Sequence, residues 1–241
     1  MGDKRGMKPY YQDEMVTLFH ADSLEEMSSL SQSSFDCVIT DPPYTKSVHS
    51  NARSSKGSIS SGGGIDFEHF TDEILDSAFE QMGLLTKRWI ISTLAWQQAF
   101  RLSENPPTGL DFKRLGVWVK TTYAPQVLAD RPSSAWESII YLHKAGQVSS
   151  WNGGGRHGNF IGNIARPNGH PTSKPIELVN FFVEMFTNPG DIILDPFAGS
   201  GTTLLAARTL GRRAVGFELS EKYCELTAKR LDQQTFDFGG I

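Results

Sequence analysis

The chain has 241 residues, of which 39% are hydrophobic, and a formal net charge of −4. This length and apolar content predict one large α/β domain with a buried core and exclude an intrinsically disordered chain. No apolar run approaches the ~18 residues of a membrane span, and the N-terminal segment lacks the apolar core of a signal peptide. We therefore expect a cytoplasmic protein whose two cysteines, Cys37 and Cys224, are buried and reduced.

Short apolar runs alternate along the chain with segments of helical periodicity. The apolar runs predict strands at residues 16–20, 36–40, 88–93, 115–120, 138–143, 191–194 and 214–218. The periodic segments predict helices at residues 23–30, 70–82, 96–102, 175–186, 202–210 and 221–231. Thr71 is the expected N-cap of the second helix. The core is expected to contain Trp89, Trp96, Trp118 and Trp136, and the alternative for Trp136 is a place in the wall of a binding pocket. Apolar strands separated by helices indicate a mainly parallel, doubly wound sheet, in a single domain that spans residues 1–241.

Two glycine- and serine-rich segments interrupt this alternation. Residues 45–65 are expected to form a mobile loop, and residues 144–169 a short recognition loop region. Residues 42–65 and 138–176 contain lysine and arginine but no aspartate or glutamate, although the whole chain is acidic. This distribution suits a face that binds a polyanion, but ordinary surface loops would explain it equally well.

A glycine-rich turn follows the predicted strand at residues 191–194. Residues 191–207 read DIILDPFAGSGTTLLAA, so the strand ends at Asp195 and turns through two glycines into a helix. Glycines allow a tight turn and a close approach of the backbone to a ligand, and free N–H groups point outward from a helix start. The next strand ends at Glu218, whose carboxylate is placed to accept hydrogen bonds from both hydroxyls of a ribose. The pattern predicts a nucleotide or cofactor site.

The glycine-rich turn differs from the known phosphate-binding loops, and these differences indicate which ligand it binds. No lysine follows Gly201, which excludes an NTP-binding Walker loop, and Leu204 replaces the third glycine of a dinucleotide site. Asp195 suits the ammonium group of an amino acid better than a pyrophosphate. S-adenosylmethionine combines a ribose with a cationic amino acid and has no phosphate. The alternative is a structural turn with incidental glycines.

A second motif follows the strand at residues 36–40, where residues 36–46 read DCVITDPPYTK. Prolines fix the backbone and lack N–H donors, so Asp41 and the Pro42 carbonyl form a rigid pair of hydrogen-bond acceptors. Such a pair matches an NH₂ group, which has two donors, and Tyr44 offers a ring face on which a planar base stacks. A simple Pro-Pro turn after a strand is the alternative.

These motifs resemble those of the DNA amino-methyltransferases, which use S-adenosylmethionine to methylate the exocyclic nitrogen of adenine or cytosine. The motif DPPY is similar to their catalytic motif and DPFAGSGTT to their cofactor loop. Three further segments of the chain are similar to segments of this family: HADSLEEM at residues 20–27, HPTSKPIELV at 170–179 and GFELSEKYCELTAKRL at 216–231. The catalytic motif precedes the cofactor loop, as in the circularly permuted beta group of the family. The resemblance implies a Rossmann-like methyltransferase fold, with a seven-stranded sheet that contains one antiparallel strand and helices on both faces.

The resemblance also implies roles for individual residues. It assigns catalysis to Asp41, Pro42, Pro43 and Tyr44. It assigns cofactor binding to Asp22, Ser23, Asp41, Thr172, Ser173, Lys174, Asp195, Pro196, Phe197, Ala198, Gly199, Ser200, Gly201, Thr202, Thr203, Glu218 and Leu219. From the two loops, contacts with DNA are expected for Lys46, Arg53, Lys56, Arg156 and Arg166.

The implied reaction is site-specific methylation of the adenine N6 amine in double-stranded DNA, which leaves S-adenosylhomocysteine. The base must be flipped out of the duplex, and no metal is expected because the histidines lack ligand spacing. Adenine is preferred over cytosine N4 because DPPY is the commoner motif of adenine enzymes in this family. The alternatives are an N4-cytosine enzyme, the same chemistry on RNA or protein, and a non-catalytic relative. Because the recognition region is short, we expect either a short target site or recognition shared with a second subunit in a homodimer. The family resemblance also suggests that the protein belongs to a restriction-modification system.

Overall fold

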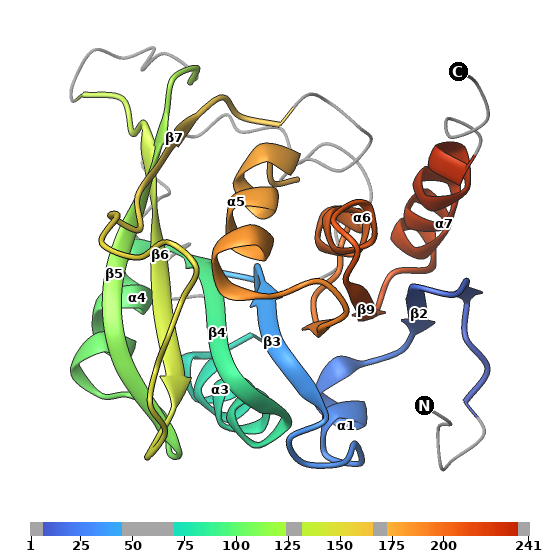
Figure 1. Ribbon diagram of the computed structural model, residues 1–241, viewed down its shortest axis with the longest axis horizontal. Helices are drawn as coiled ribbons and strands as arrows, with labels where there is room; N and C mark the ends of the chain where they lie inside the picture. The colour runs from blue at the N-terminus through green and yellow to red at the C-terminus, as the bar shows by residue number, and fades with distance from the viewer. Residues whose placement is uncertain (1–6, 45–69, 124–131, 166–172, 236–241) are drawn as a thin grey trace.

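The computed structural model describes residues 7–44, 70–123, 132–165 and 173–235 (Figure 1). In these ranges nine strands form one sheet, in the order β1-β2-β9-β8-β3-β4-β6-β5-β7. The strands are β1 (Tyr11–Gln12), β2 (Val16–His20), β3 (Phe35–Thr40), β4 (Thr86–Leu94), β5 (Leu110–Lys120), β6 (Trp136–Lys144), β7 (Phe160–Gly162), β8 (Ile192–Asp195) and β9 (Arg213–Glu218). The predicted mobile loop at residues 45–65 lies outside the described ranges.

The body of the sheet consists of seven strands, and a short strand lies at each edge. The edge strands β1 and β7 have only two and three residues, and the sequence does not predict them because such short runs carry no periodicity. Among the seven inner strands, β6 alone runs against its neighbours, β4 and β5. The predicted mixed, mostly parallel α/β sheet is confirmed, and its expected count of seven strands is corrected to nine.

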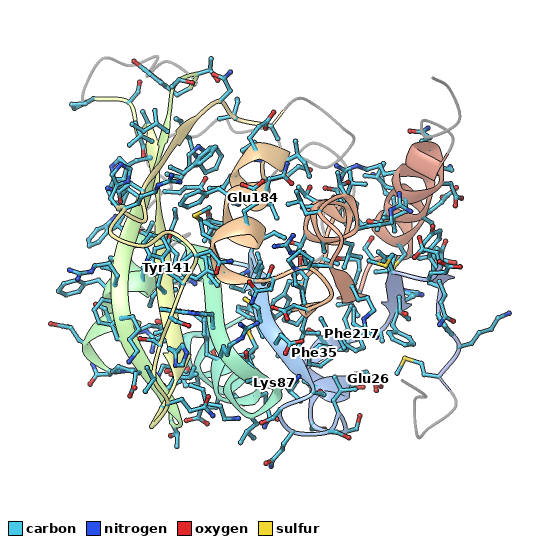
Figure 2. All side chains as sticks on the ribbon, viewed as in Figure 1. Glu26, Phe35, Lys87, Tyr141, Glu184 and Phe217 are labelled. Carbon is cyan, nitrogen blue, oxygen red and sulfur yellow. The ribbon has the colours of Figure 1, made fainter. Side chains whose placement is uncertain are left out.

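Helices cover both faces of the sheet (Figure 1). One face carries α1 (Ser23–Met27), α3 (Asp72–Leu85) and α4 (Trp96–Glu104), and the other carries α5 (Ile176–Phe186), α6 (Thr202–Thr209) and α7 (Glu221–Thr235). Each face has its own hydrophobic core because successive strand residues point to opposite sides. In β3, Val38 packs with α3 and α4, whereas Cys37 and Ile39 pack with α5 and α6. Phe35 and Phe217 belong to the same core as Val38 (Figure 2).

The helix termini agree with the sequence to within a few residues. The side chain of Thr71 accepts a hydrogen bond from the Ile74 amide at 3.3 Å, which confirms it as the N-cap of α3. The helix α1 ends at Met27 instead of residue 30. None of the helices in the described ranges is long and apolar enough to cross a membrane.

The buried residues of the core are mostly those that the sequence indicates, with two exceptions among the tryptophans. Trp89 and Trp118 are 6% and 2% exposed, as expected, and both cysteines are buried and unpaired. Trp96 and Trp136 are 57% and 43% exposed, so their expected place in the core is wrong. Each is the first residue of its element, where the helix or strand emerges from the packed interior.

The carboxyl ends of β9, β8, β3 and β4 meet at one edge of the sheet, because these four neighbouring strands are parallel. Glu218 ends β9, Asp195 ends β8, and Asp41 follows β3 directly. Ligands of doubly wound sheets bind in the crevice beyond such strand ends. The fold therefore brings together two motifs that are far apart in the sequence.

Candidate active site

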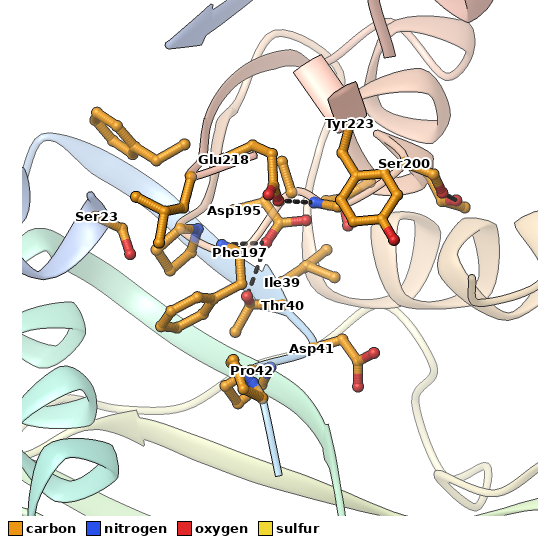
Figure 3. A pocket seen from close by; sticks show the side chains of 18 of the residues that line it. Ser23, Ile39, Thr40, Asp41, Pro42, Asp195, Phe197, Ser200, Glu218 and Tyr223 are labelled. Atoms are coloured by element: carbon orange, nitrogen blue, oxygen red, sulfur yellow. Dashed lines mark hydrogen bonds between the residues drawn. The ribbon is translucent and has the colours of Figure 1, made fainter. Parts of the chain in front are cut away.

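A cavity of about 480 Å³ opens at this edge of the sheet (Figure 3). The residues that the sequence predicts as functional and that line this cavity are Asp22, Ser23, Asp41, Pro42, Pro43, Tyr44, Ser173, Lys174, Asp195, Pro196, Phe197, Ala198, Gly199, Ser200, Thr202, Thr203, Glu218 and Leu219. The volume is within the ~300–1,000 Å³ of small-molecule and cofactor sites. One cavity thus contains both the Asp-Pro-Pro-Tyr motif and the glycine-rich turn.

The glycine-rich turn is held from behind by α7. Gly201 has a φ of 75° and is the N-cap of α6, and a β-carbon on it would lie 2.3 Å from Cγ2 of Thr227. Both its conformation and this contact therefore require glycine. The Thr227 hydroxyl donates to the Gly199 carbonyl at 3.1 Å, and Arg230 donates to the Ser200 carbonyl. These contacts fix the backbone of the turn against the C-terminal helix.

Asp195 is a buried carboxylate in the cavity wall. Its Oδ1 accepts hydrogen bonds from the Thr40 hydroxyl at 2.7 Å and from the Phe197 amide at 3.1 Å (Figure 3). The Thr203 hydroxyl is a further donor, and in the described ranges no lysine or arginine pairs with this carboxylate. Burial raises the pKa of Asp195 to about 6, in spite of these donors. The site therefore holds an acid that a cationic ligand would stabilise in its ionised form.

Glu218 is bound by two backbone amides. The Gly199 amide donates to its Oε2 and the Ser220 amide to its Oε1, both at 2.8 Å. Burial raises the pKa of Glu218, and these hydrogen bonds act in the opposite direction. Each carboxylate oxygen has a further lone pair that can accept a hydrogen bond from a ligand hydroxyl.

Asp41 lies at the other end of the cavity, with a different set of partners. The Thr93 hydroxyl donates to its Oδ1 at 2.6 Å, and the Lys174 ammonium donates to its Oδ2 at 2.5 Å. Burial raises the pKa of Asp41, although Lys174 opposes the shift. Burial disfavours the charge on Lys174, but the carboxylates of Asp41 and Glu137 outweigh it and raise the pKa of this lysine. Lys174 is therefore a fixed cation at the catalytic motif.

Comparison with known proteins agrees with this geometry. The family described as DNA methylase matches residues 148–229. Two relatives are each 28% identical to the chain, with 94% of this chain and 93% of the relative covered: the type II methyltransferases M2.LlaDCHI of Lactococcus lactis subsp. cremoris and M2.DpnII of Streptococcus pneumoniae. The crystal structure of the M1.HpyAVI–SAM complex has a TM-score of 0.67 and 26% identity, and covers 90% of this chain and 100% of that one.

The chain is thus similar over 94% of its length to type II DNA methyltransferases. Its Asp-Pro-Pro-Tyr strand, β3, precedes the strand of its glycine-rich turn, β8, in the sequence, yet the two strands are hydrogen-bonded neighbours in the sheet. Ligands bind beyond the strand ends of such a sheet, so the layout of the site depends on which strands are neighbours and not on the order of the motifs in the chain.

An acid that the sequence does not single out, Glu137, lies beside the Asp-Pro-Pro-Tyr motif. Its Oε1 accepts from Lys120 at 2.6 Å, and its Oε2 lies 3.5 Å from the Lys174 ammonium. Burial would raise the pKa of Glu137, but the two lysines outweigh it and lower this pKa. The phenol of Tyr44 lies beside Glu137, and desolvation raises the pKa of Tyr44.

Other residues that shape the cavity are also not part of the sequence motifs. Thr40 and Thr93 are hydroxyl residues within apolar strands, which is a weak signal, because such positions are often only structural. Phe70, which precedes α3, and Tyr223 of α7 line the cavity, and no local pattern distinguishes them from core residues. Tertiary packing alone brings these side chains to the site.

The remaining predicted residues lie apart from the cavity or outside the described ranges. Gly201 is not among the lining residues and instead shapes the turn behind them. Arg156 is exposed and is not part of the cavity wall. The predicted residues outside the described ranges are Lys46, Arg53, Lys56, Arg166 and Thr172.

Proposed function

We propose that this protein is a DNA methylase that transfers a methyl group from S-adenosylmethionine to the exocyclic N6 amine of adenine in double-stranded DNA. The observation that carries the proposal is the single cavity that joins a rigid pair of acceptors, Asp41 and Pro42, to the glycine-rich turn and its two acids. An amine held at the first group would meet an electrophile held at the second. The related M1.HpyAVI structure is a complex with SAM, which supports this cofactor.

The residues of the turn fit S-adenosylmethionine. Asp195 suits the ammonium of its amino acid, because this buried carboxylate has no cationic partner among the described residues and a pKa of about 6. The two outer lone pairs of Glu218 suit the two ribose hydroxyls. Bound there, the cofactor supplies an electrophilic methyl group on its sulfonium.

The Asp-Pro-Pro-Tyr motif fits the target amine. Thr93 and Lys174 each take one lone pair of Asp41, so each oxygen of its carboxylate keeps another for an N–H group. The carbonyl of Pro42 accepts the second N–H of the amine, and Tyr44 stacks on the flipped base. Holding both N–H groups favours the tetrahedral nitrogen that attacks the methyl group, and much of the rate comes from this positioning.

The target base and the DNA contacts follow from the family resemblance. Within the family the sequence DPPY is commoner in adenine enzymes, and N4 of cytosine is the alternative. We assign recognition of the target sequence to residues 45–65 and 144–169, and a homodimer would supply a second recognition surface. Light scattering of the protein with and without DNA tests this last point.

The test of the proposed function uses purified protein, labelled S-adenosylmethionine and DNA from a bacterial strain without methylases. Mass spectrometry of the digested nucleosides separates N6-methyladenine from N4-methylcytosine, and sequencing of the product identifies the site. Parallel reactions with RNA and protein test the other substrate classes. Binding of S-adenosylmethionine without transfer to any DNA would contradict the proposal and favour a non-catalytic relative.

A further inference from the structure

Four charged side chains form a continuous row behind the Asp-Pro-Pro-Tyr motif. Lys120 of β5 contacts Glu137 of β6 at 2.6 Å, Glu137 lies 3.5 Å from Lys174, and Lys174 contacts Asp41 at 2.5 Å. The side chains of Lys174, Glu137 and Lys120 are 10%, 18% and 19% exposed. The row therefore lies largely out of solvent, where charges interact strongly.

The row balances two cations with two carboxylates, and this balance matters for the reaction proposed above. In the transfer, the nitrogen lone pair forms the new N–C bond while sulfur keeps the electron pair of the broken S–C bond. The positive charge thus moves from sulfur to the nitrogen, which then releases a proton to water. A pocket with Lys174 and Asp41 but without Glu137 would become more positive at the point where the nitrogen becomes cationic.

Glu137 is linked to both reactive parts of the motif, to Asp41 through Lys174 and to Tyr44 directly. Through Lys174 it acts on the carboxylate of Asp41, and its own carboxylate lies beside the Tyr44 hydroxyl. Because Glu137 orients both the acceptor of the amine, Asp41, and the stacking ring, Tyr44, its removal should change the rate of the chemical step. A purely structural ion pair would instead only join β5 and β6 to the segment before α5.

We propose that Glu137 is a positioning residue for methyl transfer, which offsets the charge of Lys174 and holds Asp41 and Tyr44 in their reactive arrangement. This inference rests on the proposed function. Glu137 does not touch the substrate in this role, and it acts through Lys174 and Tyr44. Its effect is expected on the rate of transfer and not on the affinity for S-adenosylmethionine, since Glu137 is not among the residues that line the cavity.

The principal experiment compares Glu137→Gln with the wild type, with labelled S-adenosylmethionine and the methylase-free DNA. We expect kcat to fall roughly tenfold to hundredfold, because one charge acts through a few ångströms of protein, while the Kd for S-adenosylmethionine stays within about twofold. Glu137→Asp keeps the charge and is expected to recover part of the rate. Asp111→Asn is the matched control, because it removes a carboxylate from the Asp111–Lys113 pair on the same sheet, away from the cavity.

The pH profile separates positioning from a general loss of structure. Asp41 is faced by Lys174, Glu137, Thr93 and Tyr44, and the negative charge of Glu137 raises its pKa. Glu137→Gln removes this charge, so the acid limb of the kcat profile should move to lower pH although the plateau falls. A wild-type rate, or a loss of S-adenosylmethionine binding together with the rate, would overturn the proposal.

A second measurement does not depend on activity. Unfolding free energies of the wild type, Glu137→Gln, Lys174→Met and the double variant form a double-mutant cycle for the Glu137–Lys174 contact. Non-additive effects support the contact on which the proposal depends, and additive effects overturn it. If the wild type methylates no DNA, the proposed function fails, and this cycle still decides whether the two residues are coupled.

Discussion

Two aspartates stand at the carboxyl ends of adjacent strands, and their surroundings differ: the Asp41 side chain is 28% exposed, whereas Asp195 is 3% exposed. Asp41, after β3, has the ammonium of Lys174 on one oxygen and the Thr93 hydroxyl on the other. Asp195, at the end of β8, accepts only from hydroxyl and amide groups within the described ranges. Burial raises the pKa of both acids, but among the residues that the structure describes only Asp41 has a cation in contact with it.

This difference indicates what each acid is suited to bind. Asp41 is already neutralised by the protein, so it suits a neutral amine that needs an acceptor of fixed orientation. Burial disfavours the ionised form of the Asp195 carboxylate, so this site suits a ligand that carries its own positive charge. The Thr40 hydroxyl, one residue before Asp41, donates to Asp195 and links the two sites.

The largest expected effect is that of Asp41→Ala on the chemical step. Methyl transfer should fall by at least roughly a hundredfold, because the amine loses its charged acceptor, whereas S-adenosylmethionine should still bind. Single-turnover rates measure the first effect and calorimetric titration the second. Activity close to that of the wild type would remove Asp41 from the catalytic role.

Asp195→Asn should have opposite effects on binding and stability. Affinity for S-adenosylmethionine should fall roughly tenfold to hundredfold, because the ammonium loses its partner. The pKa of about 6, compared with the ordinary 3.8, means that ionised Asp195 destabilises the free protein by roughly 3 kcal/mol at neutral pH. The free variant should therefore melt at a higher temperature, and a lower melting temperature would contradict the difference between the two acids.

Gly201→Ala tests whether the turn beside Asp195 depends on its contact with α7. The variant should lose roughly 2–4 kcal/mol of unfolding free energy, since it combines a left-handed conformation with the contact to Thr227. Gly211→Ala is the matched control, because Gly211 has a φ of 76° and no neighbour within 4 Å of the added carbon. Chemical denaturation of both variants measures the difference. Equal losses would show that the contact with Thr227 is easily relieved.

The smallest expected effect is the pH dependence of cofactor binding. As the pH falls below about 6, Asp195 becomes protonated and the affinity for S-adenosylmethionine should drop, by about tenfold at pH 5. The stability of the free protein changes in the opposite direction: the contribution of Asp195 is present below its ordinary pKa of 3.8 and is lost as the pH rises through about 6. Titrations of wild type and Asp195→Asn at several pH values measure this, and a wild-type affinity that does not change with pH would contradict the role of Asp195.

The sequence by itself determined the two motifs, the alternation of strands and helices, and most of the cavity wall. Local physics explains this success. Prolines fix the backbone around Asp41, the turn at Gly201 requires glycine, and apolar strands buried on both faces have a recognisable composition. The sequence did not predict the two edge strands, because they are too short to show a periodicity. It also did not predict that Trp96 and Trp136 are exposed, because exposure depends on where an element leaves the core.

Only the tertiary structure decided which charges meet at the site. Lys174, Glu137 and Asp41 come from three distant parts of the chain, and no spacing in the sequence relates them. The family resemblance assigns Lys174 to cofactor binding, and the fold adds that its ammonium contacts Asp41. Residue types and local turn conformations can be predicted from the sequence. The balance of charge at the site depends on long-range packing, which brings separate strand ends together.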